Sequence, residues 1–123
     1  MAGQGQTGWR RIVSATFNSF AGFRAAWKHE AAFRQECALA VVLIPAAYWV
    51  GRTPVEWVLL IGSVLLVLIV ELLNTAVEAT VDRVGLEHHK LSGRAKDLGS
   101  SAVFVALAIT AMTWGLIGWE NLG

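Results

Sequence analysis

Charged residues, cysteine and proline are all scarce in this sequence of 123 residues. Only 15% of the residues are charged and 55% are hydrophobic, a balance that is too apolar for a small soluble domain with a large surface to cover. The single cysteine, Cys37, excludes an internal disulfide and a cysteine-based metal cluster. The composition therefore favours one small membrane-embedded domain.

Several catalytic motifs are absent as well. There is no G-x-x-x-x-G-K-[ST] segment and no protein-kinase signature set, which excludes the soluble nucleotide-binding architectures. The lack of a Glu-x-x-His pair argues against a di-metal carboxylate bundle. The literal G-x-G-x-x-G of Gly3, Gly5 and Gly8 follows no strand, so we interpret it as a chance match. Because the N-terminal segment lacks a short apolar core followed by a small-residue cleavage site, we expect no cleaved signal peptide.

Three stretches carry no charge at all, at residues 37–50, 57–70 and 98–119. Only the third, with 22 residues, has the full length of a membrane span, and the first two have 14 each. They reach that length if Arg34, Glu36 and Glu71 enter the membrane region, where ionisable residues are costly and usually functional. The alternative for the short stretches is a soluble helical bundle. We predict an all-α membrane protein with three spans, at about residues 34–51, 54–84 and 97–119.

The basic residues and tryptophans favour the three-span interpretation. Nine of the ten Lys and Arg residues precede the first span or lie between the second and the third, and only Arg52 lies in the other loop. The positive-inside rule then places the N-terminus in the cytoplasm and the C-terminus outside. Trp49, Trp57, Trp114 and Trp119 would mark the outer interface. A soluble bundle explains neither pattern.

The segment of about residues 9–30, before the first span, has apolar residues at the spacing of one helix face and basic residues around them. This predicts an amphipathic helix on the inner leaflet, with its cations near lipid headgroups. A helix that packs into the same bundle is the alternative.

The second span has a clear start and an excess of length. Thr53 is a natural N-cap, Pro54 suits the first helical position, and Glu56 completes a capping box. A helix from Pro54 to about Val84 is about 46 Å long, which exceeds the roughly 30 Å hydrocarbon core. Its last turns must therefore emerge into the cytoplasm. The next segment, residues 85–97, is predicted to be a cytoplasmic loop in which Ser92 and Gly93 are turn or cap residues.

Four polar residues lie on one face of this helix: Glu71, Asn74, Glu78 and Asp82. Because a helix turns about 100° per residue, the four side chains lie within about 80° of one another. We call them the polar stripe. Glu71 falls near the inner boundary of the hydrocarbon, whereas Glu78 and Asp82 fall in or beyond the headgroup zone.

The stripe and its surroundings contain the groups that phosphoryl transfer needs. Glu78 and Asp82, with Glu30, are candidate oxygen ligands for a hard divalent cation. Lys90, Arg94 and Lys96 are candidate partners for phosphate groups, helped by the N–H groups where the third span begins. Glu71 is a candidate general base for a lipid hydroxyl.

Each of these assignments has a plainer alternative. Glu78 or Asp82 could pair with Arg83 or Lys96, and the loop cations could serve only as topology markers. The adjacent His88 and His89 cannot chelate from one helix face, so a solvated pair is their default interpretation. An ion pathway along the stripe is the non-catalytic rival, but the outer half of the helix offers only Ser63.

Three segments strongly resemble the prokaryotic integral-membrane diacylglycerol kinase family: RAAWKHEAAFRQE (24–36), VELLNTAVEATVDR (70–83) and LSGRAKDLGSSAV (91–103). The resemblance covers nearly the whole chain. It implies a homotrimer in the bacterial inner membrane that phosphorylates diacylglycerol with Mg-ATP at sites shared between neighbouring subunits. No nucleic-acid partner is expected. A sister branch phosphorylates undecaprenol, and the AFRQE segment resembles the diacylglycerol branch.

The resemblance also implies roles for individual residues. Glu71 matches the catalytic base, and Glu30 and Glu78 match the Mg²⁺ ligands. From their place on the stripe, apart from the resemblance, we expect Asn74 and Asp82 to be supporting residues. The implied ATP-binding residues are Arg11, Glu30, Glu78, Glu87, His88, His89, Lys96 and Asp97. The implied lipid-binding residues are Arg24, Ala25, Ala26, Trp27, Ala32, Phe33, Arg34, Gln35, Glu36, Glu71 and Ser100.

This chain departs from the family pattern at three positions. Asn18 stands where an aromatic residue is usual, and Lys28 and His29 stand where an apolar residue and Asn are usual. The base and the metal ligands are unaffected by these departures.

Overall fold

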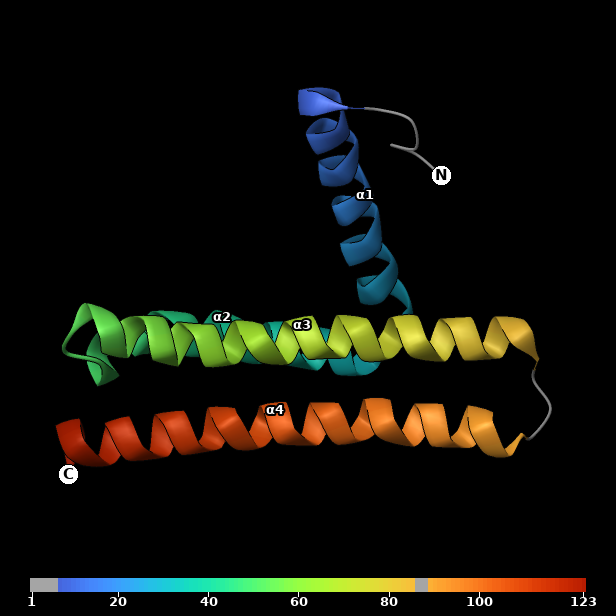
Figure 1. Ribbon diagram of the computed structural model, residues 1–123. Coiled ribbons are helices and arrows are strands. Elements are labelled where there is room, and N and C mark those ends of the chain that lie inside the picture. Colours follow the sequence, from blue (N-terminus) through green and yellow to red (C-terminus); the bar gives the residue numbers. More distant parts are fainter. Residues whose placement is uncertain (1–6, 86–88) are drawn as a thin grey trace.

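The computed structural model describes residues 7–85 and 89–123. It contains four helices, α1 (Gly8–His29), α2 (Ala31–Val50), α3 (Pro54–Val84) and α4 (Lys90–Leu122). Helices α2, α3 and α4 lie side by side, and α1 leaves this bundle across the direction of the other three (Figure 1). Every regular element in the described part of the chain is helical, as the sequence predicts.

Helices α2, α3 and α4 are each long and apolar enough to cross a membrane. Their outward faces carry large apolar side chains, such as Val41, Val58 and Phe104, which are 73%, 70% and 74% exposed. Hydrocarbon, not water, is the solvent that suits such a surface. The fold is therefore that of a membrane protein with three helices able to span.

Helix α3 begins as its sequence predicts. The backbone N–H of Glu56 donates to the Thr53 hydroxyl oxygen at 3.2 Å, and Pro54 occupies the first turn. The Glu56 carboxylate accepts a hydrogen bond from the N–H of Arg52 at 3.0 Å, so the capping box closes one residue earlier than in the usual pattern. The helix ends at Val84, in agreement with the predicted end.

Helices α3 and α4 make the most extensive contact in the bundle. Leu60 is fully buried between the helices, and its carbonyl oxygen accepts a hydrogen bond from the Trp114 indole at 3.1 Å. The Thr110 hydroxyl donates to the carbonyl oxygen of Ser63 at 3.0 Å. Polar contacts of this kind join helices in surroundings where apolar burial alone contributes little.

The opposite end of the bundle from Glu30 is closed by a network that the sequence did not predict. Asn121 is 8% exposed, and its side-chain amide donates to the Val50 carbonyl at 2.8 Å and to the Glu56 carboxylate at 2.6 Å. The Arg52 guanidinium in turn donates to the Asn121 carbonyl oxygen. This network ties the last turn of α4 to the turn between α2 and α3.

The predicted loop of residues 85–97 is wrong in its extent. Helix α4 already begins at Lys90, and the Nδ1 atom of its N-cap, His89, accepts a hydrogen bond from the N–H of Leu91 at 3.0 Å. Ser92 and Gly93 therefore lie inside the helix and not in a turn. The charged residues from Lys90 to Asp97 show where α4 leaves the apolar part of the bundle, but the helix continues through them.

Candidate functional site

The polar stripe of α3 faces the interior of the bundle at one end and water at the other. Glu71 and Asn74 are only 5% and 9% exposed, Glu78 is half-buried, and half of the Asp82 side-chain surface is exposed. The same helix face therefore passes from a desolvated environment to an aqueous one over 11 residues, about 16 Å.

Carboxylates from α2, from α3 and from the break between α1 and α2 interact with Glu71. Glu71 interacts electrostatically with Glu78 on its own helix and with Glu30, which forms the break between α1 and α2. Glu36 of α2 interacts with Glu71 from another side. Buried like charges repel each other strongly unless cations or hydrogen bonds compensate them. The cluster is therefore suited to receiving positive charge.

Asn74 connects two parts of the stripe. Its side-chain amide donates to the Glu78 Oε1 atom at 2.9 Å. The Asn74 Oδ1 atom and the Glu36 Oε2 atom are buried without a hydrogen-bond partner in the described part of the chain. Unsatisfied buried acceptors are uncommon, so these two oxygen atoms are candidates for hydrogen bonds to a group outside the described residues.

No group of three or more His, Cys, Asp or Glu residues suited to a metal ion occurs among residues 7–85 and 89–123. A cage made only of protein ligands is therefore absent from the described chain. Mg²⁺ seldom uses such a cage, because it keeps several waters and binds one or two carboxylates together with substrate phosphates. Glu30 and Glu78, which both interact electrostatically with Glu71, are the carboxylates that could serve in this second mode.

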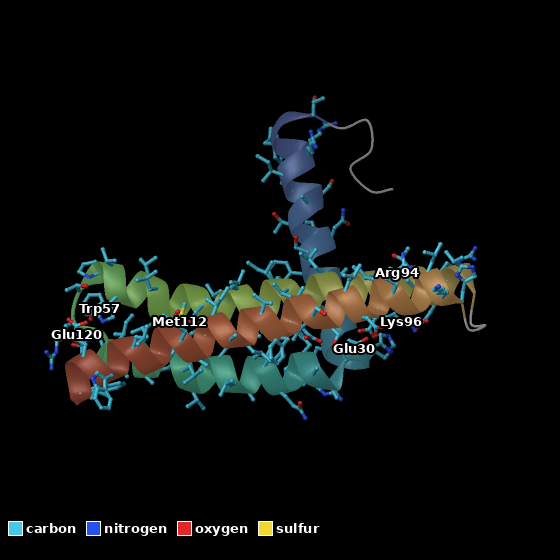
Figure 2. All side chains as sticks on the ribbon, turned by 60° about the horizontal axis from the view of Figure 1, so that its bottom comes forward. Glu30, Trp57, Arg94, Lys96, Met112 and Glu120 are labelled. Atoms are coloured by element: carbon cyan, nitrogen blue, oxygen red, sulfur yellow. The ribbon has the colours of Figure 1, made fainter. Side chains whose placement is uncertain are left out.

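The cationic side of the site lies at the same end of the bundle. Figure 2 shows Glu30, Arg94 and Lys96 toward one end and Trp57 and Glu120 toward the other. The Lys96 ammonium forms an ion pair with Asp82 at 2.7 Å, which is the plainer alternative that the sequence left open for Asp82. Both side chains are about half exposed, so Lys96 keeps access to solvent.

Arg34 holds the elbow between α1 and α2. Its guanidinium Nη1 atom donates to the carbonyl oxygens of Trp27 at 2.6 Å and Lys28 at 3.4 Å. These carbonyls belong to the last turn of α1, where helix groups lack partners and a cation is favourable. Because Glu30 is the next residue beyond this turn, Arg34 fixes the position of Glu30.

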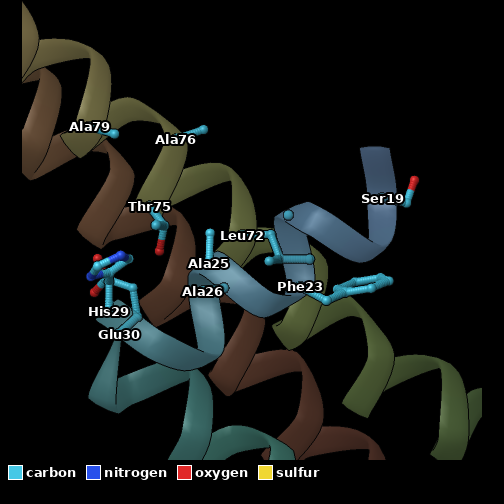
Figure 3. A pocket seen from close by; sticks show the side chains of 11 residues that line it. Ser19, Phe23, Ala25, Ala26, His29, Glu30, Leu72, Thr75, Ala76 and Ala79 are labelled. Carbon is cyan, nitrogen blue, oxygen red and sulfur yellow. The ribbon is translucent and has the colours of Figure 1, made fainter. Parts of the chain in front are cut away.

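A cavity of about 600 Å³ lies between α1 and α3 (Figure 3). Its lining consists of Ser19, Gly22, Phe23, Ala25, Ala26, His29, Glu30, Leu72, Thr75, Ala76 and Ala79. Small apolar side chains dominate, and in Figure 3 His29, Glu30 and Thr75 lie toward one end and Phe23 toward the other. The cavity lining is therefore mostly apolar, with a polar end at His29, Glu30 and Thr75, which suits an amphiphilic ligand.

The predicted lipid-binding residues are only partly gathered. Ala25 and Ala26 line the cavity, and Glu36 interacts electrostatically with Glu71. Arg24, Trp27, Gln35 and Ser100 are exposed, Ala32 and Arg34 are half-buried, and Phe33 is buried.

The predicted nucleotide-binding residues are less well gathered. Arg11 lies 19 residues before Glu30, about 28 Å along α1, on a helix that leaves the bundle (Figure 1). Asp97 is exposed, and His89 serves as the N-cap of α4. Glu87 and His88 lie outside the described residues.

Sequence reasoning missed two residues beside the stripe. Thr75 lines the cavity and lies four residues after Glu71, a spacing that places the two on neighbouring parts of one helix face. Gly99 of α4 lies against the side chain of Asn74. Spacing along α3 was a signal for Thr75, whereas no local signal identified Gly99, because its contact joins two helices.

Comparison with known proteins identifies the family of this chain. The family model described as prokaryotic diacylglycerol kinase matches residues 17–118. The diacylglycerol kinase of Escherichia coli K12 is 50% identical over 117 residues, covering 95% of this chain and 96% of that protein. The diacylglycerol kinase of Pseudomonas aeruginosa PAO1 is 57% identical over 114 residues and 93% of each chain, and that of Haemophilus influenzae Rd is 52% identical over 109 residues, covering 89% and 92%. With its membrane-spanning helices and its carboxylates grouped around Glu71, the chain belongs to the prokaryotic diacylglycerol kinase family.

Proposed function

We propose that this lipid kinase transfers the γ-phosphoryl group of Mg-ATP to the hydroxyl group of diacylglycerol, giving phosphatidic acid at the cytoplasmic boundary of the bacterial inner membrane. The observation that carries the proposal is the burial gradient along the polar stripe, from Glu71 at 5% exposure to the half-exposed Asp82. One substrate arrives from hydrocarbon and the other from water, and the stripe spans that boundary.

The lipid approaches through the cavity between α1 and α3. Support comes from its apolar lining of Phe23, Leu72 and small residues, and from the polar end at Glu30 and Thr75. The lipid-binding residues are Arg24–Trp27, Ala32–Glu36, Glu71 and Ser100. An acyl chain suits the apolar length, and the glycerol hydroxyl suits the polar end.

Glu71 is the general base. Its carboxylate takes the proton of the lipid hydroxyl while that oxygen forms a bond to the γ-phosphorus, and the bond from phosphorus to the ADP oxygen breaks. A positioned base typically contributes about 10²–10⁴ in rate. Deep burial beside other carboxylates supports this role, because a solvated acid would not sit where a lipid hydroxyl lies.

Glu30 and Glu78 hold Mg²⁺ together with the phosphates of ATP. The ion supplies neutralising charge on the β- and γ-phosphates when it is bound. The side chains that bind the nucleotide are Arg11, Glu30, Glu78, Glu87, His88, His89, Lys96 and Asp97. Asn74 orients Glu78, and the ion pair of Asp82 with Lys96 positions a cation beside the phosphates.

The active unit is a homotrimer with its N-terminus in the cytoplasm, its C-terminus outside and α1 on the inner leaflet. Support comes from the distance of Arg11 from the cluster, from the unpartnered Glu36 and Asn74 oxygens, and from the large apolar side chains exposed along α1. Sites shared between subunits would bring Arg11 of one chain to the carboxylates of its neighbour.

An assay of the purified protein in micelles tests this function. Diacylglycerol and undecaprenol are offered separately with labelled ATP and Mg²⁺, and label is expected in phosphatidic acid. Label in undecaprenyl phosphate alone would assign the chain to the sister branch. Label in neither lipid would overturn the lipid-kinase mechanism.

The rival ion pathway has little support. Ser63 is the one polar side chain between Trp57 and Val70, and its hydroxyl donates to the Leu60 carbonyl of its own helix at 2.8 Å. No further polar group continues the stripe through that part of α3.

A further inference from the structure

Gly99 of α4 lies directly against the side chain of Asn74. A Cβ atom added at Gly99 would overlap the Asn74 Oδ1 atom and lie 3.2 Å from Cγ and 3.8 Å from the Cα of Asn74. The other glycines inside α4 differ: added Cβ atoms at Gly93 and Gly115 meet nothing within 4 Å, and one at Gly118 meets only the Val50 Cγ1 atom, at 4.0 Å. Gly99 is therefore the glycine of α4 that lies against the polar stripe.

This close approach fixes which way the Asn74 amide faces. The Nδ2 atom points to Glu78 with a hydrogen bond of 2.9 Å, and the Oδ1 atom occupies the space over Gly99. The reversed amide would bring Oδ1 against the Glu78 carboxylate, where two acceptors repel each other. At 9% exposure Asn74 has little room for a third orientation.

We propose that Gly99 is a positioning residue of the phosphoryl-transfer site. Because Gly99 has no side chain, the Asn74 Oδ1 atom fits against it, and the Nδ2 atom stays directed toward Glu78. The inference rests on the proposed function in that Glu78 is taken as a ligand of Mg-ATP. A methyl group at position 99 forces Asn74 to turn or the two helices to separate. Either movement breaks the hydrogen bond that orients the Glu78 carboxylate.

Gly99→Ala is the test, and Gly115→Ala is its matched control on the same helix. Both changes raise helix propensity equally, but only the first adds a methyl group against the stripe. Gly99→Ala is expected to raise the KM for Mg-ATP and the midpoint of the Mg²⁺ titration on the order of tenfold, since a hydrogen bond to a charged group is lost. The KM for the lipid is expected to stay within twofold, and Gly115→Ala to match the parent protein.

A double variant separates positioning from a general packing defect. If the contact with Asn74 is the cause, adding Gly99→Ala to an Asn74→Ala background changes nothing further, because the amide that the methyl group displaces is gone. Asn74→Ala also provides the space for the methyl group, so the comparison holds even if Gly99→Ala alone does not fold.

The outcome is read from Mg²⁺-dependent binding of a non-hydrolysable ATP analogue by calorimetry, beside turnover, in the intact detergent-solubilised protein. Nucleotide binding is measured without the acceptor lipid. The test therefore remains valid even if the lipid substrate differs from the one proposed above. Equal Mg²⁺-nucleotide affinity in Gly99→Ala and Gly115→Ala would overturn the inference. Additive losses in the double variant would overturn it as well.

Discussion

At the scale of single residues, this molecule places polar groups where they are costly. Glu71 is 5% exposed, and it interacts with the carboxylates of Glu78 and Glu30 instead of with a cation. Removing one carboxylate from such a cluster relieves repulsion, so the grouping of these carboxylates does not stabilise the fold. Their arrangement is consistent with the phosphoryl-transfer role proposed for them.

Glu71→Gln tests the proposed role of Glu71 as the general base separately from nucleotide binding. The amide keeps the shape of the side chain but cannot take a proton, so turnover is expected to fall about 10²–10⁴-fold while nucleotide affinity changes little. Turnover and affinity for an ATP analogue are measured on the same folded oligomer. Near-normal turnover, or a loss explained by absent ATP binding, would remove Glu71 from the role of base.

Glu30→Gln and Glu78→Gln act on the metal. Neutral amides bind a hard cation poorly, so both variants are expected to lose at least about tenfold in turnover at low Mg²⁺ and to need more Mg²⁺ for half-maximal rate. Titration of Mg²⁺ at fixed ATP measures the change. Glu120→Gln, an exposed position at the other end of the bundle, is the matched control. Unchanged titration curves in both variants would exclude these residues from the metal site.

The polar stripe could be predicted from the sequence because its four residues lie on one helix, where their spacing alone determines which face they share. Glu71, Asn74, Glu78 and Asp82 share a face on α3 whatever surrounds them, and their burial follows from depth along the bundle. The ion pair between Asp82 and Lys96 was only one of several alternatives, and the contact of Asn74 with Gly99 had no signal at all. Such contacts depend on how α4 packs on α3, which periodicity does not encode.

At the scale of elements, local signals predicted where α3 begins and tertiary contacts completed its start. Thr53 and Pro54 are local signals and were sufficient to predict the first turn. Glu56, by contrast, also accepts a hydrogen bond from Asn121, which is 65 residues away and at the end of α4. The sequence predicts the start of α4 too late for a different reason: the first two turns of α4 are charged, and a charged segment beside a membrane span favours the prediction of a loop.

Asn121→Ala tests the network at the end of the bundle opposite Glu30. The change removes the hydrogen bonds that the buried Asn121 amide donates to the half-buried Val50 carbonyl and Glu56 carboxylate, so the melting temperature is expected to fall by several degrees, on the order of 1–3 kcal/mol. Thermal unfolding in detergent measures it, with the adjacent exposed Glu120→Ala as control. Equal melting temperatures would show that the network contributes no stability.

Arg34→Gln tests the elbow between α1 and α2. Loss of the guanidinium frees the carbonyls of Trp27 and Lys28, so faster hydrogen exchange in the last turn of α1 and about a tenfold loss of turnover are expected. The exposed Arg10→Gln, on the first turns of α1, is the control. Normal exchange with lost turnover would show that Arg34 acts through its proposed contact with the lipid and not by holding the elbow.

At the scale of the whole molecule, the described part of one chain does not bring all of the proposed site residues together. Helix α1 carries Arg11 away from the carboxylate cluster, and the buried oxygens of Glu36 and Asn74 lack partners within the described chain. Charge and tryptophan distribution were enough to predict three membrane helices from sequence. The number of subunits followed from family resemblance alone, because no pattern within one chain encodes the symmetry of an assembly.

Mixing two inactive variants tests whether sites are shared. Glu71→Gln and Arg11→Ala subunits are each expected to assemble into oligomers with little activity. If the base and Arg11 of a site come from different subunits, random co-assembly in equal amounts restores about a quarter of parental activity, because one site in four receives both intact residues. Activity of the mixture is measured after joint unfolding and reassembly in micelles, with separately reassembled variants as the reference. Mixed oligomers that form but stay inactive would place Glu71 and Arg11 of each site in one subunit, and α1 would then have to fold back toward its own carboxylates.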